Sequence, residues 1–413
     1  MVKGNPCSLK LSVICSIFLV LFTYSELHAQ VGSTLPAWSE GYLDIHHINT
    51  GKGESSFFIF PDGTTMLVDA GSSSRVRPPR PNPQPNASRM PGEWISRYIL
   101  QMMEGQQVKK IDYILLTHFH SDHMGDLQYP GVTDSENGPY KVTGITQVGD
   151  LVKFSKIVDR GWDFLTPKDD YFENYRNFVD WQVQNNGIVY EKLRVGYNDQ
   201  LTMVNRPDKY NNFEIRNIAA NGVIWTGFST NVRNHFPSLE SLTPQEYPSE
   251  NINSIAFRLS YGRFDYFNGG DISTAEPYDW RDIETPIGLV TGPVDVCIAN
   301  HHAYLNAMGD SFLKATRPRV HIIQASCPTH PSSNALLGML STELYPGPRD
   351  VFATYIMDEA QVVIGPTIDK LKSQRGHIVV RVSPGGDTYM IYILDDSSEE
   401  YKVIAVHGPY NSN

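Results

Sequence analysis

The segment that decides the fold is Leu116-Thr117-His118-Phe119-His120-Ser121-Asp122-His123-Met124-Gly125-Asp126. It continues an apolar run, Ile111 to Leu116, that predicts a buried strand. Side chains alternate along an extended backbone, so His118 and His120 are expected to project to the same side. Asp122 and His123 follow where the chain opens a helix and can face a neighbouring point. Two pairs of ligands in so short a segment favour two adjacent metal ions over one.

The metal expected at this segment is zinc. Imidazole and carboxylate are ligands that zinc prefers, with manganese or iron as alternatives. A polar surface loop is the competing interpretation of the segment. Only 13 of the 413 residues are histidine, so chance rarely places three of them and an aspartate this close together. The pattern therefore indicates a metal site.

Further strands are expected on both sides of this segment, and they define the fold class. The predicted strands are Leu43–Ile48, Phe57–Phe60, Met66–Asp69, Ser254–Leu259, Phe264–Asn268, Val294–Ala299, Val320–Ala325, Ile378–Val382 and Tyr389–Leu394. Helical spacing of apolar residues occurs at Glu93–Met103 and Ser311–Thr316. Strands first, then mixed strands and helices in two similar halves, predict an α/β fold of two mixed sheets packed face to face, with helices outside.

The N-terminal segment is expected to be removed from the mature chain. Lys3 and Lys10 give the segment a positively charged start, and a mostly apolar run follows from Leu11 to Tyr24. Leu27-His28-Ala29 then offers a small-residue cleavage site. These three features are typical of a secretory signal peptide. Residues 1–29 are therefore assigned to the signal, and the protein is expected in the periplasm or outside the cell. No transmembrane segment is expected in the mature chain.

The remaining chain, 30–413, is predicted to be one domain. Residues from about 130 to 215 are polar and aromatic, without long periodic runs, and are interpreted as an insertion. Gly71 to Gly92 is rich in proline, which predicts an extended surface loop. The mature chain keeps Cys297 and Cys327; two buried free thiols are favoured over a disulfide, which stays open as the alternative.

The charge of the chain restricts its partners. The formal net charge is -11, and it becomes about -12 once Lys3, Lys10 and Glu26 leave with the signal. Binding of nucleic acid by counterion release needs a basic surface, so nucleic acid is not favoured as a partner. A small phosphate ester is still compatible with this charge, because metal ions supply positive charge locally.

The segment with two histidines, an aspartate and a third histidine resembles that of the metallo-β-lactamase superfamily. Leu67-Val68-Asp69-Ala70-Gly71 resembles the Asp-x-Gly turn of that superfamily. The resemblance is closest to hydrolase domains of the ComEC type, known from DNA-uptake channels and secreted phosphorylcholine esterases. It rests on the opening segment His47 to Ser55 with Pro61-Asp62-Gly63, on Asn253-Ser254, and on Thr329-His330-Pro331-Ser332. The resemblance implies the αββα sandwich of this superfamily.

The resemblance also implies a ligand set for two metal ions. His118 and His120 would hold one ion, Asp122 and His123 the other, and Asp271 would bridge them. The last ligand would come from His301-His302, with His302 slightly favoured as the ligand and the other histidine facing the substrate. Many members supply a third histidine to the first ion; His235 is the only candidate here, and its surroundings do not match a family motif.

The expected chemistry is metal-assisted hydrolysis, with a water shared by the two ions activated as hydroxide. Asp122 or Asp271 would orient this water. The leaving group would take a proton from His330, from the non-ligand histidine of the pair, or from Tyr304.

Four functions remain open from the sequence, one of them a nuclease, which the acidic charge disfavours. A small-molecule ester, either a phosphodiester or another phosphorylated compound, is favoured as substrate. Hydrolysis of a lactone or β-lactam by the same centre is the first alternative. A non-catalytic binding protein that retained the fold is the second, and the complete ligand set argues against it. No Gly-x-Ser-x-Gly segment supports a serine nucleophile.

Overall fold

The computed structural model describes residues 1–2, 30–73, 82–274, 279–324 and 327–413. The predicted signal peptide lies almost entirely outside the described residues. Part of the proline-rich stretch and Ala325, the predicted end of a strand, also lie outside them.

The first sheet contains nine strands within the described residues, in the order β19-β18-β17-β1-β2-β3-β4-β7-β8. Their bounds are β1 Leu43–His47, β2 Ser56–Ile59, β3 Thr65–Val68, β4 Ile111–Leu115, β7 Phe154–Asp159, β8 Val189–Lys192, β17 His377–Val382, β18 Thr388–Leu394 and β19 Val403–Asn411. Strands β3, β4, β7 and β8 pair in parallel, whereas the strands from β19 to β3 pair antiparallel. The sheet is therefore mixed, as predicted.

The second sheet contains eight strands in the same described ranges, in the order β11-β10-β9-β12-β13-β14-β15-β16. Their bounds are β9 Phe213–Ala220, β10 Val223–Trp225, β11 Val232–Asn234, β12 Ala256–Tyr261, β13 Phe264–Asn268, β14 Val296–Ile298, β15 Val320–Ile323 and β16 Asp350–Ala353. Strands β13 to β16 pair in parallel. A separate pair, β5 (Thr133–Asp134) and β6 (Lys141–Val142), forms a small antiparallel ribbon.

The core between the sheets follows from the alternation of apolar side chains along the strands. On β2 and just beyond it, Phe58 and Phe60 belong to a cluster that also contains Phe257 and Tyr266 of the second sheet. Phe57 and Ile59 point the other way, into a cluster with the helices. Because both faces of the strand are buried, the first sheet is an inner layer, with the second sheet packed on one face of it.

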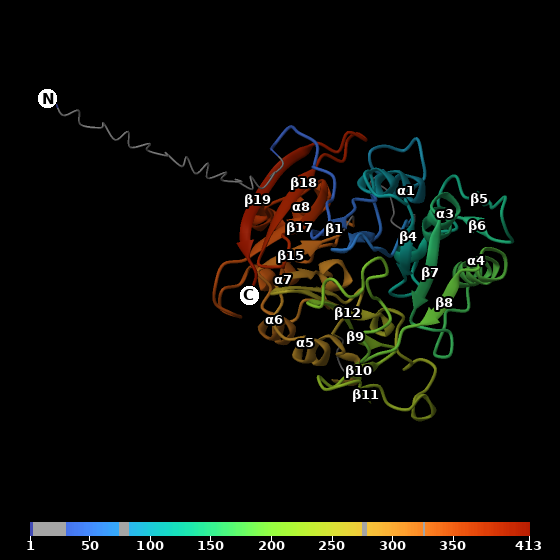
Figure 1. Cartoon of the computed structure of the whole chain (residues 1–413). Helices are drawn as coiled ribbons and strands as arrows, with labels where there is room; N and C mark the ends of the chain where they lie inside the picture. The colour runs from blue at the N-terminus through green and yellow to red at the C-terminus, as the bar shows by residue number, and fades with distance from the viewer. Residues whose placement is uncertain (3–29, 74–81, 275–278, 325–326) are drawn as a thin grey trace.

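The helices cover the outer faces of the two sheets (Figure 1). Helices α1 (Pro91–Met102), α3 (Gly144–Leu151) and α4 (Asp170–Asn186) share a buried apolar cluster with the first sheet. Helices α5 (Glu284–Thr291), α6 (Asp310–Thr316), α7 (Ser333–Leu340) and α8 (Asp358–Ile364) share another with the second sheet. The order of layers is helix, sheet, sheet, helix, which confirms the predicted metallo-β-lactamase sandwich.

The region predicted as an insertion is built into this sandwich. Its strands β7 and β8 extend the first sheet beyond β4, and β9 begins at its end and joins the second sheet beside β12. Helix α4 is held at its start by Asp169, whose side chain accepts a hydrogen bond from the Phe172 N–H. The division of the chain into a signal and one domain stays a prediction.

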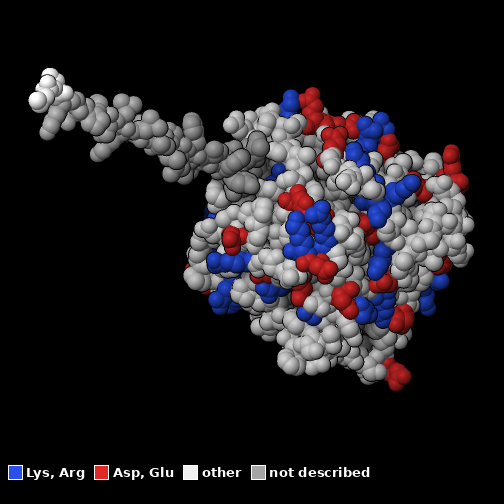
Figure 2. All heavy atoms as spheres, in the orientation of Figure 1, with Lys and Arg blue, Asp and Glu red and all other residues white. Residues whose placement is uncertain are grey.

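The two cysteines among the described residues are free thiols, Cys297 buried in β14 and Cys327 half-buried. Within the described part of the chain, no helix is long and apolar enough to cross a membrane. Acidic and basic side chains are interspersed on the face shown in Figure 2, which carries no continuous basic surface.

Buried histidines predict a fall in stability at mildly acidic pH. His321 of β15 is fully buried with its Nε2 3.0 Å from the Tyr345 hydroxyl, and burial lowers its pKa to about 3. Since the same group in the unfolded chain has a pKa near 6.5, the unfolded state binds a proton below pH 6.5 that the folded state does not. The free energy of unfolding therefore falls by about 1.4 kcal/mol per pH unit for each such histidine.

Urea unfolding near pH 7.5 and near pH 5.5 measures this effect. We expect the His321→Gln variant to lose about 1.4 kcal/mol less stability than the unmodified protein over that interval. An identical loss in both proteins would contradict the assignment.

Candidate metal centre

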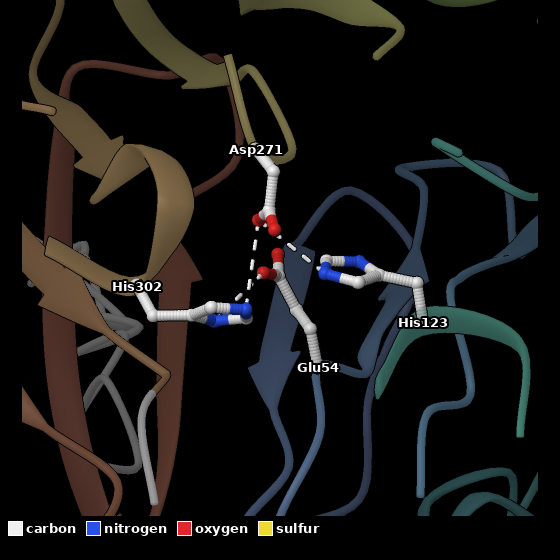
Figure 3. A group of neighbouring side chains, drawn as sticks. All are labelled: Glu54, His123, Asp271 and His302. Carbon is white, nitrogen blue, oxygen red and sulfur yellow. Dashed lines mark ion pairs between the residues drawn. The ribbon is translucent and has the colours of Figure 1, made fainter. Parts of the chain in front are cut away.

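The ends of several strands bring polar side chains to one edge of the sandwich. The segment of His118 to His123 follows β4, Asp271 follows β13, and His302 follows β14. Glu54 lies in the turn between β1 and β2. Figure 3 shows that Glu54, His123, Asp271 and His302 come from four separate parts of the chain and point toward one another. Side chains from both sheets therefore meet at this edge of the sandwich.

The first group of potential ligands is Glu54, His123, Asp271 and His302, all buried, each with one ligand atom within 4.8 Å of those of the others. Asp271 Oδ1 lies 3.3 Å from His123 Nε2 and 3.5 Å from His302 Nε2. Three predicted ligands thus converge, and Glu54, which was not predicted, joins them. Asp122, the remaining predicted ligand of this ion, lies beside the group, with Oδ2 3.6 Å from His302 Nε2.

The second group consists of His118, His120 and again Asp271. His118 Nε2 lies 3.1 Å from His120 Nδ1 and 3.6 Å from Asp271 Oδ2. The two imidazoles thus lie together, as predicted, although β4 ends at Leu115 and the backbone bends at His118 and Phe119. Because the two oxygens of Asp271 face different groups, this carboxylate lies where a ligand shared by two metal ions belongs.

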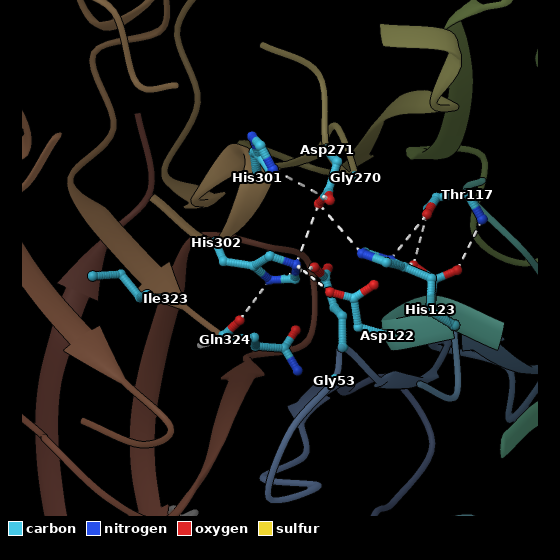
Figure 4. A network of polar contacts seen from close by, with 12 residues as sticks. Gly53, Thr117, Asp122, His123, Gly270, Asp271, His301, His302, Ile323 and Gln324 are labelled. Carbon is cyan, nitrogen blue, oxygen red and sulfur yellow. Dashed lines mark hydrogen bonds and ion pairs between the residues drawn. The ribbon is translucent and has the colours of Figure 1, made fainter. Parts of the chain in front are cut away.

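The hydrogen bonds of two histidines leave their metal-facing nitrogens unpaired. His123 Nδ1 lies 2.7 Å from Asp69 Oδ2, and His302 Nδ1 lies 2.8 Å from the Gln324 carbonyl oxygen (Figure 4). Donation by Nδ1 fixes the tautomer in which Nε2 carries the lone pair, which is how histidine ligands are commonly oriented. Asp69 is fixed in turn by the N–H and hydroxyl of Thr117.

Four buried atoms of the first group make no hydrogen bond among the described residues: Glu54 Oε1, His123 Nε2, Asp271 Oδ1 and His302 Nε2. Buried polar atoms without a partner are uncommon and need an explanation. Nitrogen lone pairs and carboxylate oxygens in this density suit a divalent cation such as zinc. The residues present therefore fit the metal that the sequence predicted.

His301 is engaged differently from its neighbour. Its Nε2 lies 2.9 Å from Asn251 Nδ2, and its Nδ1 lies 2.8 Å from Asn306 Oδ1. Both ring nitrogens are thus occupied by side-chain amides, although Nε2 also lies 3.9 Å from Asp271 Oδ2. This arrangement favours His302 as the ligand of the pair and leaves His301 beside it.

The backbone at this pair is left-handed, with φ of 45° at His301, 52° at His302 and 60° at Ala303. Non-glycine residues rarely adopt such angles, so the surrounding structure must hold the turn. Buried Glu284 accepts hydrogen bonds from the Asn300 side chain and from the Met308 and Gly309 N–H groups. These bonds anchor the turn at both ends.

Close backbone contacts hold Glu54 next to the helix that carries Asp122. The Glu54 N–H donates to the Asp122 carbonyl at 2.8 Å, and the Gly71 N–H donates to the Glu54 carbonyl at 2.9 Å. A Cβ at Gly71 would lie 1.6 Å from the Asp122 carbonyl oxygen, so only glycine fits there. The Asp-x-Gly turn is therefore required for this packing.

The charges of the site balance one another. Burial opposes a charge on Asp271, but His302, His123 and His118 outweigh it and hold the pKa of the carboxyl well below its usual range. Burial likewise opposes a charge on His302, yet Asp271 and Asp122 raise its pKa to about 9. Burial raises the pKa of Glu54 to about 7. The raised pKa values of His123 and His302 thus reflect the same negative charge of Asp271 that would attract a cation.

The remaining predicted residues lie beside the two groups or away from them. His330 stacks on His302, with ring centroids 5.5 Å apart, and Tyr304 lies 5.0 Å from His330. Burial lowers the pKa of His330 to about 3, so its imidazole is neutral at neutral pH. His235 lies elsewhere, with its Nε2 3.1 Å from the Asp282 carbonyl oxygen, and belongs to neither group.

Glu54 was not predicted as a site residue. In the sequence it stands in a glycine-rich turn, Gly51-Lys52-Gly53-Glu54, where a glutamate is ordinarily solvated. Its burial depends on the packing of that turn against α2 (Ser121–Met124). The available signal was its place in the segment His47 to Ser55, which carries the family resemblance.

A match to a known protein family covers part of this site. The sequence profile of the Metallo-beta-lactamase superfamily matches residues 49–129, which include Glu54, Asp69 and the histidine segment. The crystal structure of unliganded yeast PDE1 aligns with 82% of this chain and 98% of its own, at 11% sequence identity and a TM-score of 0.32. No curated protein sequence matches the chain.

Residues 49–129 therefore resemble the metallo-β-lactamase superfamily in sequence, and the layers of the whole chain agree with the sandwich of that superfamily. The profile covers about a fifth of the chain and ends before Asp271 and His302, but the fold brings these two residues to the matched histidines. The matched domain, the sandwich and the converging ligands together support a metal-dependent hydrolase.

Proposed function

We propose that this protein hydrolyses phosphodiesters or other small phosphorylated esters at a centre of two divalent cations, with zinc as the favoured metal. The observation that carries the proposal is the placement of Asp271, whose two oxygens face two separate groups of imidazole nitrogens. His118 and His120 would hold one ion, and Asp122, His123 and His302 the other. When bound, two such ions supply a nucleophile at neutral pH and neutralise charge on the ester oxygens.

The residues around this centre have separate tasks. Asp69 and the Gln324 carbonyl orient His123 and His302 through their Nδ1 atoms. Glu54 adds a buried carboxylate whose Oε2 lies 3.7 Å from His302 Nδ1. His330 stacks on His302, and Tyr304 lies beside His330 and His301. The neutral imidazole of His330 would give a hydrogen bond to the leaving oxygen rather than the proton that the sequence predicted, which leaves the Tyr304 O–H as the proton donor of this pair.

The relationship to ComEC-type hydrolases and the location outside the cytoplasm belong to this proposal. The motifs from His47 to Ser55 and at Asn253-Ser254 support the first, and the apolar N-terminal segment supports the second. The competing activity is hydrolysis of a lactone or β-lactam, which needs the same centre. A binding protein without activity would have no reason to keep so many buried ligand atoms without hydrogen-bond partners.

Metal analysis followed by a substrate panel tests the proposal. We expect the purified protein to hold two zinc ions and to hydrolyse bis-p-nitrophenyl phosphate or p-nitrophenyl phosphorylcholine faster than nitrocefin. Chelation should lower the rate by about a hundredfold or more, because the site residues alone provide no nucleophile, and added zinc should restore it. Rapid hydrolysis of nitrocefin alone would favour the β-lactam alternative, and metal without any hydrolysis would favour a binding protein.

A further inference from the structure

A cavity of about 500 Å³ opens beside the metal centre, on the side of His120. His120, Ser121 and Phe119 form one wall. The opposite walls come from two segments outside the family match, Leu165–Tyr171 and Pro244–Asn253. Cavities that hold small molecules are commonly about 300–1,000 Å³, so this one has room for a ring-sized group.

The lining of the cavity is mostly flat and apolar. Leu165, three prolines and two tyrosines contribute to it; these are Pro167, Pro244, Pro248, Tyr171 and Tyr247. Faces of tyrosine and proline rings offer planar surfaces against which a flat ring packs with little loss of conformational freedom. The lining therefore suits a planar group better than a branched or strongly hydrated one.

The charges in the cavity wall are compensated. Glu250 is bound by the buried Arg160 through two hydrogen bonds, Nε to Oε1 at 2.8 Å and Nη2 to Oε2 at 2.6 Å. Glu250 Oε1 also accepts the Phe119 N–H at 2.8 Å. Lys168 and Asp169, of opposite charge, are exposed. A group that enters this cavity therefore meets no net charge and needs none of its own.

We propose that this cavity binds an uncharged planar ring group attached to an ester oxygen of the substrate, and that Tyr247 and Leu165 select for it. The proposal rests on the proposed hydrolysis at the metal centre, since the shared wall of His120 places an ester substituent in the cavity when the phosphorus lies at the metal ligands. The substrate class is then a phosphodiester with one flat cyclic substituent.

Two esters that release the same product test this selection. Bis-p-nitrophenyl phosphate and methyl p-nitrophenyl phosphate both release p-nitrophenolate, and they differ only in whether the second substituent is a ring or a methyl group. We expect Tyr247→Ala and Leu165→Ala each to lower the ratio of kcat/KM for the aryl over the methyl ester by about tenfold. Tyr197→Ala is the matched control, because Tyr197 is 36% exposed and does not line the cavity; it should keep the ratio.

An unchanged ratio in both Tyr247→Ala and Leu165→Ala would overturn the selection while leaving the proposed hydrolysis intact. If the zinc-loaded protein hydrolyses neither ester, the proposed function fails, and binding to metal-stripped protein then decides the cavity. Calorimetric titration with bis-p-nitrophenyl phosphate should show about tenfold weaker binding for Tyr247→Ala. Equal affinity, or no binding to the unmodified protein, would overturn the cavity as a ring site.

Discussion

The Asp271→Asn variant is expected to lose both metal ions and about a thousandfold or more of the hydrolase activity. Asp271 has one oxygen 3.3 Å from His123 Nε2 and the other 3.6 Å from His118 Nε2, so its charge acts on both positions. Asparagine keeps the shape and removes the negative charge that two cations need. Changes to residues that only orient ligands already cost about 10–100-fold, so loss of a shared ligand should cost more.

Metal content by mass spectrometry and kcat/KM toward bis-p-nitrophenyl phosphate measure this effect together. Asp199→Asn is the control, because Asp199 is an exposed aspartate that pairs with Arg194 and is not one of the proposed site residues. It should keep two ions and full activity. If Asp271→Asn retained both ions and its activity, Asp271 could not be the shared ligand.

The strands next to the histidine segment were predictable because their sequences carry the signal locally. Strands β2, β3, β4 and β13 lie within one or two residues of the predicted bounds. Each is a short run of large apolar residues limited by a turn, and burial on both faces makes such runs nearly continuous. The order of layers followed, because two mixed sheets with helices between their strands have few ways to pack.

The strands at the edges of the sheets were not predictable in the same way. Strand β19 contains Gly408-Pro409, and proline argues against a strand except at an edge, which is where β19 lies. Strand β8 has no fully buried residue and carries two charged residues among its four. Such segments become strands through pairing with a neighbour already in place, and this pairing leaves little trace in their own sequence.

The histidine segment identified itself by spacing, but the rest of the site depends on long-range contacts. Asp271 and His302 were assigned through resemblance, and only the packing of both sheets shows that they reach the same point as His123. Glu54 was missed because nothing near it in the sequence distinguishes a buried carboxylate from a solvated one. The cavity beside His120 was also not predicted, since its walls come from three segments, 119–121, 165–171 and 244–253, that are far apart in the sequence.

Alanine substitutions at His301 and His302 are expected to differ strongly in zinc content and in kcat/KM. We expect His302→Ala to retain one of two zinc ions and to lose about a hundredfold or more in kcat/KM, because Nε2 of His302 has no other partner and faces Asp271 and Asp122. His301→Ala should retain both ions, because both nitrogens of His301 are already occupied by Asn251 and Asn306. Metal content separates the two variants directly.

The two positions form a matched pair for this test. Both have a left-handed backbone, with φ of 45° and 52°, so alanine carries a similar conformational cost of about 1–2 kcal/mol at either one. A difference in zinc content therefore reports the role of the side chain and not damage to the turn. If His301→Ala lost an ion and His302→Ala kept both, the ligand would be His301, and its two amide contacts would have to break when metal binds.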